Sequence, residues 1–274
     1  PLLQHPRVVV VPHIGSATAA TDRPCPSAAC GFSPTMRSAR PAGVRPMNQA
    51  SSGTSTSASS TSGVCCASTG TGSHDIVVED AFVPEYRTHR SIDGFMCDSP
   101  GNKVNTSPLF RLPFGQIFVR AVCSSSIGAL QAALDSFIKI NRDRVGLNDA
   151  KRVAQDPGAQ AAAAQASSVI DECRTIMERN FDLMHEAAAA GTQLPIEQRI
   201  KMRYDASLVA PKCAAAINEL FIYSGAQGIF RSHPINRAWL DINAGRTHVA
   251  NNVGKFGRNW GSCMFGAENE DFFL

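Results

Sequence analysis

Apolar side chains recur at spacings of three and four residues along three long stretches, and this period most constrains the fold. Gly146 and Pro157 interrupt the pattern after the first stretch, and Gly191 and Pro195 interrupt it after the second. Each stretch is long enough for a helix with one buried face. The three apolar sets are Val119, Cys123, Ile127, Leu130, Leu134 and Phe137; Val169, Cys173, Ile176, Met177, Phe181 and Met184; and Met202, Ala206, Val209, Cys213, Ile217 and Leu220.

A fourth helix is predicted to begin near Pro234, because proline suits a first helical turn, and to run toward Asn252, ending before Gly254. Four helices of this length with short connections favour an antiparallel four-helix bundle. The predicted fold class is therefore mainly α, with the bundle in residues 108–274.

The chain before the bundle has a different composition. Residues 22–69 are rich in Ser, Thr, Ala, Pro and Gly, so they cannot bury enough surface to offset their ordering entropy, and we expect a disordered linker. In residues 70–107, short β-prone runs at Ile76–Val78 and Ala81–Val83 predict the remnant of a small sheet.

Residues 1–21 contain a four-valine run followed by Pro12, His13, Ile14 and Gly15. This segment resembles the active-site histidine segment of the D-2-hydroxyacid dehydrogenases. The glycine fingerprint of a Rossmann fold and the arginine and acidic partners of that family are absent from the sequence. We therefore interpret residues 1–21 as a dehydrogenase-like fragment without a dehydrogenase site.

Charge and cysteine content exclude several function classes. The net charge of +3 comes without a dense basic run, so we expect no nucleic-acid partner. No uninterrupted apolar run approaches the roughly 20 residues that span a bilayer, so we expect no membrane partner. The nine cysteines lack metal-ligand spacing, which argues against a metal site. Their scattered positions fit a reducing cytoplasm better than a disulfide framework.

The segment from Tyr223 to His248 carries the candidate chemistry. Gly225 and Gly228 would let the backbone approach a phosphate or a flavin edge closely. His248 is expected on the fourth helix, one turn after Ala244 and on the same face. Its imidazole changes charge near neutral pH without help from its surroundings.

From about Gly70 to the C-terminus, the chain resembles the acyl-CoA dehydrogenase superfamily. Gly70–Asp75 leading into Val83–Glu85 resembles the end of the middle β-domain, and Pro108–Gly115 resembles the entry to the C-terminal bundle. Ser224–Asp241 resembles the flavin loop and the helix that follows it. The dehydrogenase branch often has a glutamate base where this chain has Ala244. Reduced-flavin-dependent aromatic hydroxylases of the same fold carry a histidine at the position of His248.

This resemblance implies the oxygenase component of a two-component flavin monooxygenase that hydroxylates a phenolic substrate through a flavin C4a-hydroperoxide. It implies reduced FMN or FAD as cofactor, O₂ as co-substrate, a separate flavin reductase and a homotetramer. His248 would act on the substrate hydroxyl by taking or sharing its proton. The residues implied to hold the flavin are Arg111, Ser224, Gly225, Ala226, Gln227 and Gly228.

Two other function classes remain open at this point. An acyl-CoA dehydrogenase-like flavoprotein would need a glutamate base, for which Glu219 is the nearest helical candidate. A non-catalytic helical oligomerisation domain would need no flavin. We also expect a truncated or joined reading frame, since the relatives begin with a helical domain and a fuller β-domain, and an inactive fragment is one outcome of that expectation. His233 is interpreted as a turn residue, and Arg237 with Asp241 as a helix ion pair.

Overall fold

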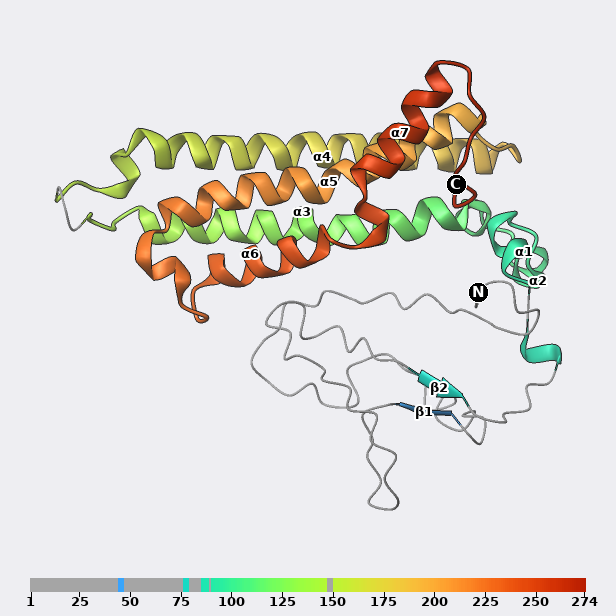
Figure 1. Ribbon diagram of the computed structural model, residues 1–274, viewed down its shortest axis with the longest axis horizontal. Coiled ribbons are helices and arrows are strands. Elements are labelled where there is room, and N and C mark those ends of the chain that lie inside the picture. Colours follow the sequence, from blue (N-terminus) through green and yellow to red (C-terminus); the bar gives the residue numbers. More distant parts are fainter. Residues whose placement is uncertain (1–43, 47–75, 79–84, 89, 147–149) are drawn as a thin grey trace. The chain divides into compact units, whose positions relative to one another are not determined.

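The computed structural model describes residues 44–46, 76–78, 85–88, 90–146 and 150–274 (Figure 1). The chain divides into two units, residues 1–91 and 92–274, and each is described by itself. The dehydrogenase-like fragment, most of the linker expected at 22–69 and the β-prone run Ala81–Val83 lie outside the described residues. The domain limits predicted at 21, 69 and 107 therefore stay predictions.

The first unit contains a short antiparallel pair of strands. Strand β1 (Val44–Pro46) pairs with β2 (Ile76–Val78), with Val44 opposite Val78 and Pro46 opposite Ile76. The apolar run predicted β2 correctly. It did not predict β1, which falls inside the segment expected to be disordered. Three residues are too few to show an alternating pattern, so the sequence gives no sign of this pairing.

The described residues of the second unit are mainly helical, and the expected bundle is confirmed. Successive long helices run antiparallel (Figure 1). The described helices are α1 (Ser91–Phe95), α2 (Pro100–Val104), α3 (Phe114–Asn141), α4 (Pro157–Ala189), α5 (Ile196–Tyr223), α6 (Pro234–Gly245) and α7 (Val253–Met264).

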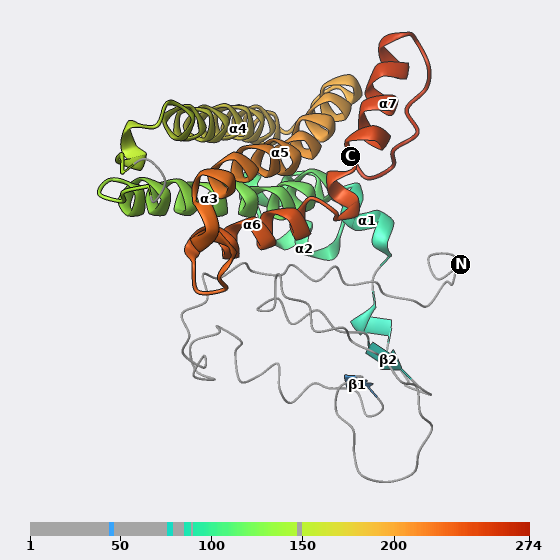
Figure 2. The ribbon, with the colours of Figure 1, turned by 60° about the vertical axis from the view of Figure 1, so that its left-hand side comes forward.

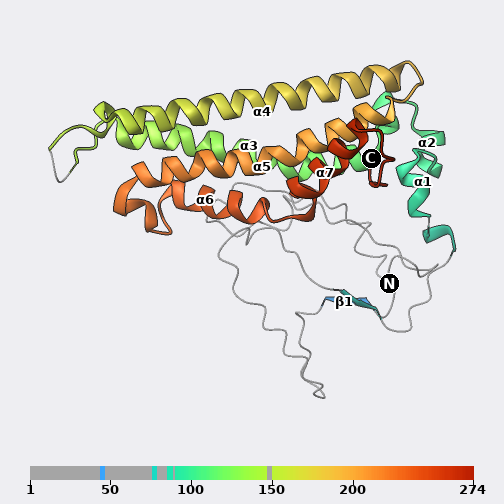
Figure 3. The same cartoon turned by 45° about the horizontal axis from the view of Figure 1, so that its top comes forward.

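Helices α3 and α5 form the centre of the bundle. Helix α4 packs on one side of this pair and α6 on the other, as Figures 2 and 3 show, and α7 packs on α5. All members of the first and third predicted apolar sets are buried, including Leu130, Cys213, Ile217 and Leu220 at 0% exposure. In the second set, Cys173, Met177 and Met184 are buried and the others are half-buried. Burial of these faces supplies the main driving force for folding.

Helix α3 is, among the described helices, the one whose length and composition would allow it to cross a membrane. Such a helix is weak evidence for a membrane, because the core helix of a bundle passes the same test. The apolar residues of α3 contact α4, α5 and α6, as those of a core helix do.

The ends of α4 are fixed by its own sequence. The Asp156 carboxylate accepts hydrogen bonds from the backbone N–H groups of Gly158 and Ala159 at 2.8 and 2.9 Å, which satisfies donors that the first turn leaves open. Pro157 occupies the first helical position. The helix ends before Gly191, whose φ of +70° suits glycine and reverses the chain toward α5.

The prediction of one helix from Pro234 toward Asn252 is wrong beyond Gly245. Helix α6 ends there, and the Asn251 side chain donates to the Gly245 carbonyl at 2.8 Å. His248 then caps the 3-10 helix η8 (Val249–Asn251), and Asn252 caps α7 by accepting from the Lys255 N–H at 2.9 Å. Polar side chains that bond to nearby backbone compete with a continuous helix. Consequently Ala244 and His248 do not share a helical face, and α7 was not predicted.

Candidate active site

His248 lies on the turn between α6 and α7. Its Nδ1 accepts a hydrogen bond from the backbone N–H of Ala250 at 3.1 Å. A neutral imidazole has one N–H, so this bond places the proton on Nε2. In this geometry, neutral His248 presents Nε2–H as a hydrogen-bond donor to whatever faces it.

The surroundings of His248 favour the neutral ring. Partial burial and the positive charge of Arg203 both lower the pKa of His248 below its ordinary value. The ring centroid of Phe118, from the second turn of α3, lies 6.1 Å from that of His248. One side of the imidazole is therefore bordered by an aromatic ring, although the residue as a whole is exposed.

The predicted flavin loop forms the 3-10 helix η7 (Gly225–Ile229) at the end of α5. Gly225 has a φ of +65°, a conformation that glycine adopts without strain. Arg144 holds the preceding carbonyls: its Nη2 donates to Tyr223 O at 2.9 Å and its Nη1 to Ser224 O. The sequence patterns did not indicate Arg144, because its partners are 79 and 80 positions away.

The residues of this loop differ in what they can offer a ligand. Ser224 is buried, and its hydroxyl donates to the Leu220 carbonyl at 2.7 Å. Gly228 is also buried, and a Cβ there would lie 3.1 Å from the Ser224 Cβ, so this glycine allows close packing. Gly225, Ala226 and Gln227 are exposed, as is Ile229 at the end of the loop. The loop therefore offers exposed backbone, while the Ser224 hydroxyl is used inside the protein.

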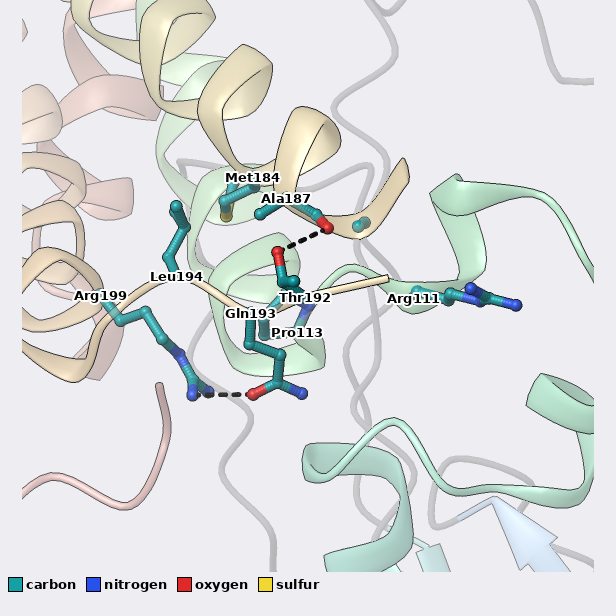
Figure 4. A pocket seen from close by; sticks show the side chains of 9 residues that line it. Arg111, Pro113, Met184, Ala187, Thr192, Gln193, Leu194 and Arg199 are labelled. Carbon is teal, nitrogen blue, oxygen red and sulfur yellow. Dashed lines mark hydrogen bonds between the residues drawn. The ribbon is translucent and has the colours of Figure 1, made fainter. Parts of the chain in front are cut away.

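Arg111 ends the 3-10 helix η5 (Pro108–Arg111), just before α3, and is exposed. It lines a shallow pocket that also includes Met184, Thr192, Leu194 and Arg199. Figure 4 shows its guanidinium pointing away from these side chains.

The structure does not bring all the predicted site residues together within one protomer. Arg111 precedes α3, whereas Arg144, which holds the glycine loop, follows it, and a 28-residue helix is about 42 Å long. Figure 1 shows the α5–α6 connection and the start of α3 at opposite ends of the bundle. His248 contacts the beginning of α3, so it lies nearer to Arg111 than to the glycine loop.

The sequence interpretations of His233 and of the Arg237–Asp241 pair have clear outcomes. His233 accepts a hydrogen bond from the Ile235 N–H at 3.3 Å and shapes the start of α6, as predicted. Arg237 Nε and Asp241 Oδ2 pair at 2.8 Å, also as predicted. Among the described residues, no group of three or more metal-ligating side chains could hold an ion. Cys123, Cys173 and Cys213 are buried, and burial raises the pKa of Cys123 to about 12.

Residues 121–253 match the model of the acyl-CoA dehydrogenase, C-terminal domain family. The oxygenase subunit HsaA of a flavin-dependent monooxygenase from Rhodococcus jostii (strain RHA1) is 31% identical over 198 residues, which cover 72% of this chain and 52% of that protein. The oxygenase component of an FADH₂-dependent resorcinol hydroxylase from Rhizobium sp. (strain MTP-10005) is 26% identical over 209 residues, or 73% and 51%.

Among solved structures, the 3-HSA hydroxylase from Rhodococcus sp. RHA1 is similar, with a TM-score of 0.70 and 30% identity over 76% of this chain and 53% of that one. The expected mainly α fold of the acyl-CoA dehydrogenase C-terminal type is thereby confirmed. The chain spans about half the length of the relatives that it matches.

Proposed function

Because this chain contains an acyl-CoA dehydrogenase C-terminal-like domain, related to the oxygenase subunits of flavin-dependent monooxygenases, we propose that it acts in hydroxylation of an aromatic, phenolic substrate. The reaction uses O₂ and a reduced flavin delivered by a separate reductase. The names of two relatives, a flavin-dependent monooxygenase subunit and a resorcinol hydroxylase component, support this assignment.

The geometry of His248 is the observation that carries the proposal. With Nδ1 occupied by the Ala250 N–H, the neutral ring directs Nε2–H outward. This N–H can donate to the oxygen of a phenol or phenolate. The bond stabilises the phenolate, whose ring is more nucleophilic than that of the neutral phenol. The lowered pKa keeps His248 neutral at pH 7. The sequence suggested that His248 takes or shares the substrate proton, but with Nδ1 occupied the neutral ring favours holding the substrate oxygen through Nε2–H.

The flavin supplies the activation of O₂ when it is bound, and this chain's residues would hold it. The exposed backbone of Gly225, Ala226 and Gln227, with the positive φ at Gly225, supports a role in approaching the flavin phosphate or ribityl chain. Ser224 would support that turn from inside and not by its hydroxyl. Arg111 and His248 both lie toward the other end of the bundle, so a flavin beside them would meet the glycine loop only of a neighbouring protomer. We therefore keep the homotetramer as part of the proposal, and either FMN or FAD as the flavin.

An acyl-CoA dehydrogenase-like activity fits the described residues less well. Ala244 carries no acid, and the nearest helical candidate for the glutamate base is Glu219. Glu219 lies 16 positions after Arg203 on α5, which corresponds to about 24 Å along the helix from the Arg203–Ala250 contact beside His248. A base at Glu219 and a flavin ring at His248 would not meet within one protomer.

Reduced-flavin binding and product analysis test the proposal. The full chain is titrated anaerobically with reduced FMN and with FADH₂, then mixed with O₂ and a panel of phenols, and hydroxylated product and H₂O₂ are both quantified. We expect flavin binding and hydroxylation by the wild type, and we expect His248→Asn to bind flavin normally but release H₂O₂ in place of product. Asparagine can still accept the Ala250 N–H, so the turn keeps its cap.

His185→Asn is the matched control, because His185 is an exposed histidine on α4. It should hydroxylate like the wild type. Hydroxylation by His248→Asn at the wild-type rate would refute the role of His248. Flavin reduction by a CoA thioester would indicate the dehydrogenase alternative, and failure to bind either reduced flavin would leave a helical oligomerisation domain.

A further inference from the structure

The last eight residues, 267–274, form a C-terminal tail that returns to the bundle. Asp271 and Leu274 are buried, at 3% and 4% exposure, and Arg199 donates to the Leu274 carbonyl oxygen. The Phe273 ring packs edge-on against Phe118, with centroids 5.4 Å apart. Phe118 is also the ring that borders His248. The tail therefore docks beside the candidate active site.

Arg203 connects this tail to the turn that carries His248. Its guanidinium is buried between the two: Nη1 donates to the Ala250 carbonyl at 2.8 Å, and Nε lies 3.7 Å from Asp271 Oδ2. It also lies over the Phe256 ring of α7, 3.4 Å from the centroid. Burial lowers the pKa of Arg203 to about 10, so it stays charged at pH 7. The Ala250 carbonyl is thus held by a hydrogen bond, whereas Asp271 Oδ2 and Arg203 Nε make no hydrogen bond at 3.7 Å and Asp271 acts as a nearby counter-charge.

The two polar groups of Ala250 transmit this position to His248. Its carbonyl accepts from Arg203, and its N–H donates to His248 Nδ1. Both groups belong to the same short helix η8, so holding the carbonyl also orients the N–H. Arg203 is therefore the α5 side chain that bonds to the backbone of this turn, and His248 caps the same turn.

Other charged residues lie on α3, which packs against the turn, and on segments close to it in the sequence. They are Arg120 on α3, Lys255 and Arg258 on α7, Glu270 and Asp271 in the tail, and Arg246 on the turn itself. Arg120 is directed into the interface of α3 and α5, where it donates to Gln116 and to the Met202 carbonyl. Arg258 and Glu270 pair at 3.6 Å on the exposed surface. The charge that lowers the pKa of His248 is that of Arg203 and not that of these other groups.

We propose that Arg203 is a positioning residue that couples the docked C-terminal tail, through Asp271, to the orientation and charge state of His248. The inference rests on the proposed function only in taking His248 as the group that meets the substrate. The docked tail keeps the Arg203 guanidinium directed at Ala250, and Asp271 offsets part of its charge.

The titration of His248, followed by NMR on the full chain without flavin or substrate, tests this coupling. Arg203→Gln removes the cation and should raise the pKa of His248, because the positive charge of Arg203 disfavours protonation of the imidazole. Asp271→Asn leaves the cation without its counter-charge and should lower that pKa. Arg203→Lys should restore most of the wild-type value. Arg258→Gln, which breaks the exposed ion pair with Glu270, should leave it unchanged.

Opposite shifts in Arg203→Gln and Asp271→Asn separate the coupling from general loosening, since loosening would hydrate the ring and raise its pKa in both variants. A rise in both, or no change in Arg203→Gln, would overturn the proposal. If Arg203→Gln does not fold, the direction of the shift in Asp271→Asn still decides between the two. Because no flavin is present, the outcome does not depend on whether the chain hydroxylates a phenol.

Discussion

Replacing Gly115 by alanine should destabilise the protein, although alanine is ordinarily the better helix former by about 1 kcal/mol. Gly115 lies in the first turn of α3, directly under the tail. A Cβ at this position would lie 2.7 Å from both the carbonyl carbon and the carbonyl oxygen of Phe273. These are backbone atoms, which cannot rotate away as the end of a side chain can. The tail must therefore move as a unit.

The size of the effect follows from what the tail buries. Leu274 is 4% exposed, and Phe273 packs against Phe95, Phe114 and Phe118. Complete burial of one Leu or Phe side chain contributes about 1.5–3 kcal/mol, so full release of the tail would cost at least roughly 3 kcal/mol. A partial shift costs less, and the helix gains some propensity. We expect a net loss of about 2 kcal/mol.

Urea unfolding of Gly115→Ala and Gly128→Ala provides the measurement. Gly128 is an exposed glycine of the same helix, and nothing lies within 4 Å of the Cβ that it would acquire. Gly128→Ala should therefore stabilise the protein by about 0.5–1 kcal/mol. Equal changes of the same sign in both variants would refute the reasoning, because they would mean that the tail does not lie on Gly115 in solution.

Two further predictions concern the loop and the imidazole. Arg144→Ala should lower the amide-exchange protection of residues 225–230 by about tenfold, because it removes a charge-assisted hydrogen bond to this part of the backbone. Arg142→Ala, at an exposed neighbouring position, should leave that protection unchanged. Equal protection in the two variants would contradict the role of Arg144. The pKa of His248 is lowered in the folded state, so the unfolded chain binds its proton more readily, and the free energy of unfolding should fall as the pH drops through about 6.5. This pH dependence should be weaker in His248→Asn, and an identical dependence in both proteins would contradict the lowered pKa.

The bundle was predictable because its signal is local. Each apolar stripe repeats many times along one helix, and the short gaps at Gly146–Pro157 and Gly191–Pro195 leave few ways to arrange the helices. The break after Gly245 was missed because it depends on single side chains, His248 and Asn252, that can either continue a helix or cap a new one.

The candidate site was only partly predictable. The sequence order of Arg111, the glycine loop and His248 gave no information on their distances, and α3 separates the first two by most of the length of the bundle. Arg203 and Asp271 are 68 positions apart and follow no motif, so only the folded chain reveals their pairing. Ser224 was expected to hold the flavin, yet its position at the end of α5 lets its hydroxyl donate to the Leu220 carbonyl.

The most direct test of the proposed function is the fate of O₂ consumed by the complex with reduced flavin in the presence of a phenol. We expect wild type and His185→Asn to convert a large share of the O₂ into hydroxylated product, and His248→Asn to release nearly all of it as H₂O₂ with unchanged flavin affinity. Equal product from wild type and His248→Asn would contradict the assignment of His248. Absence of product from the wild type with both flavins would contradict the proposed hydroxylation itself.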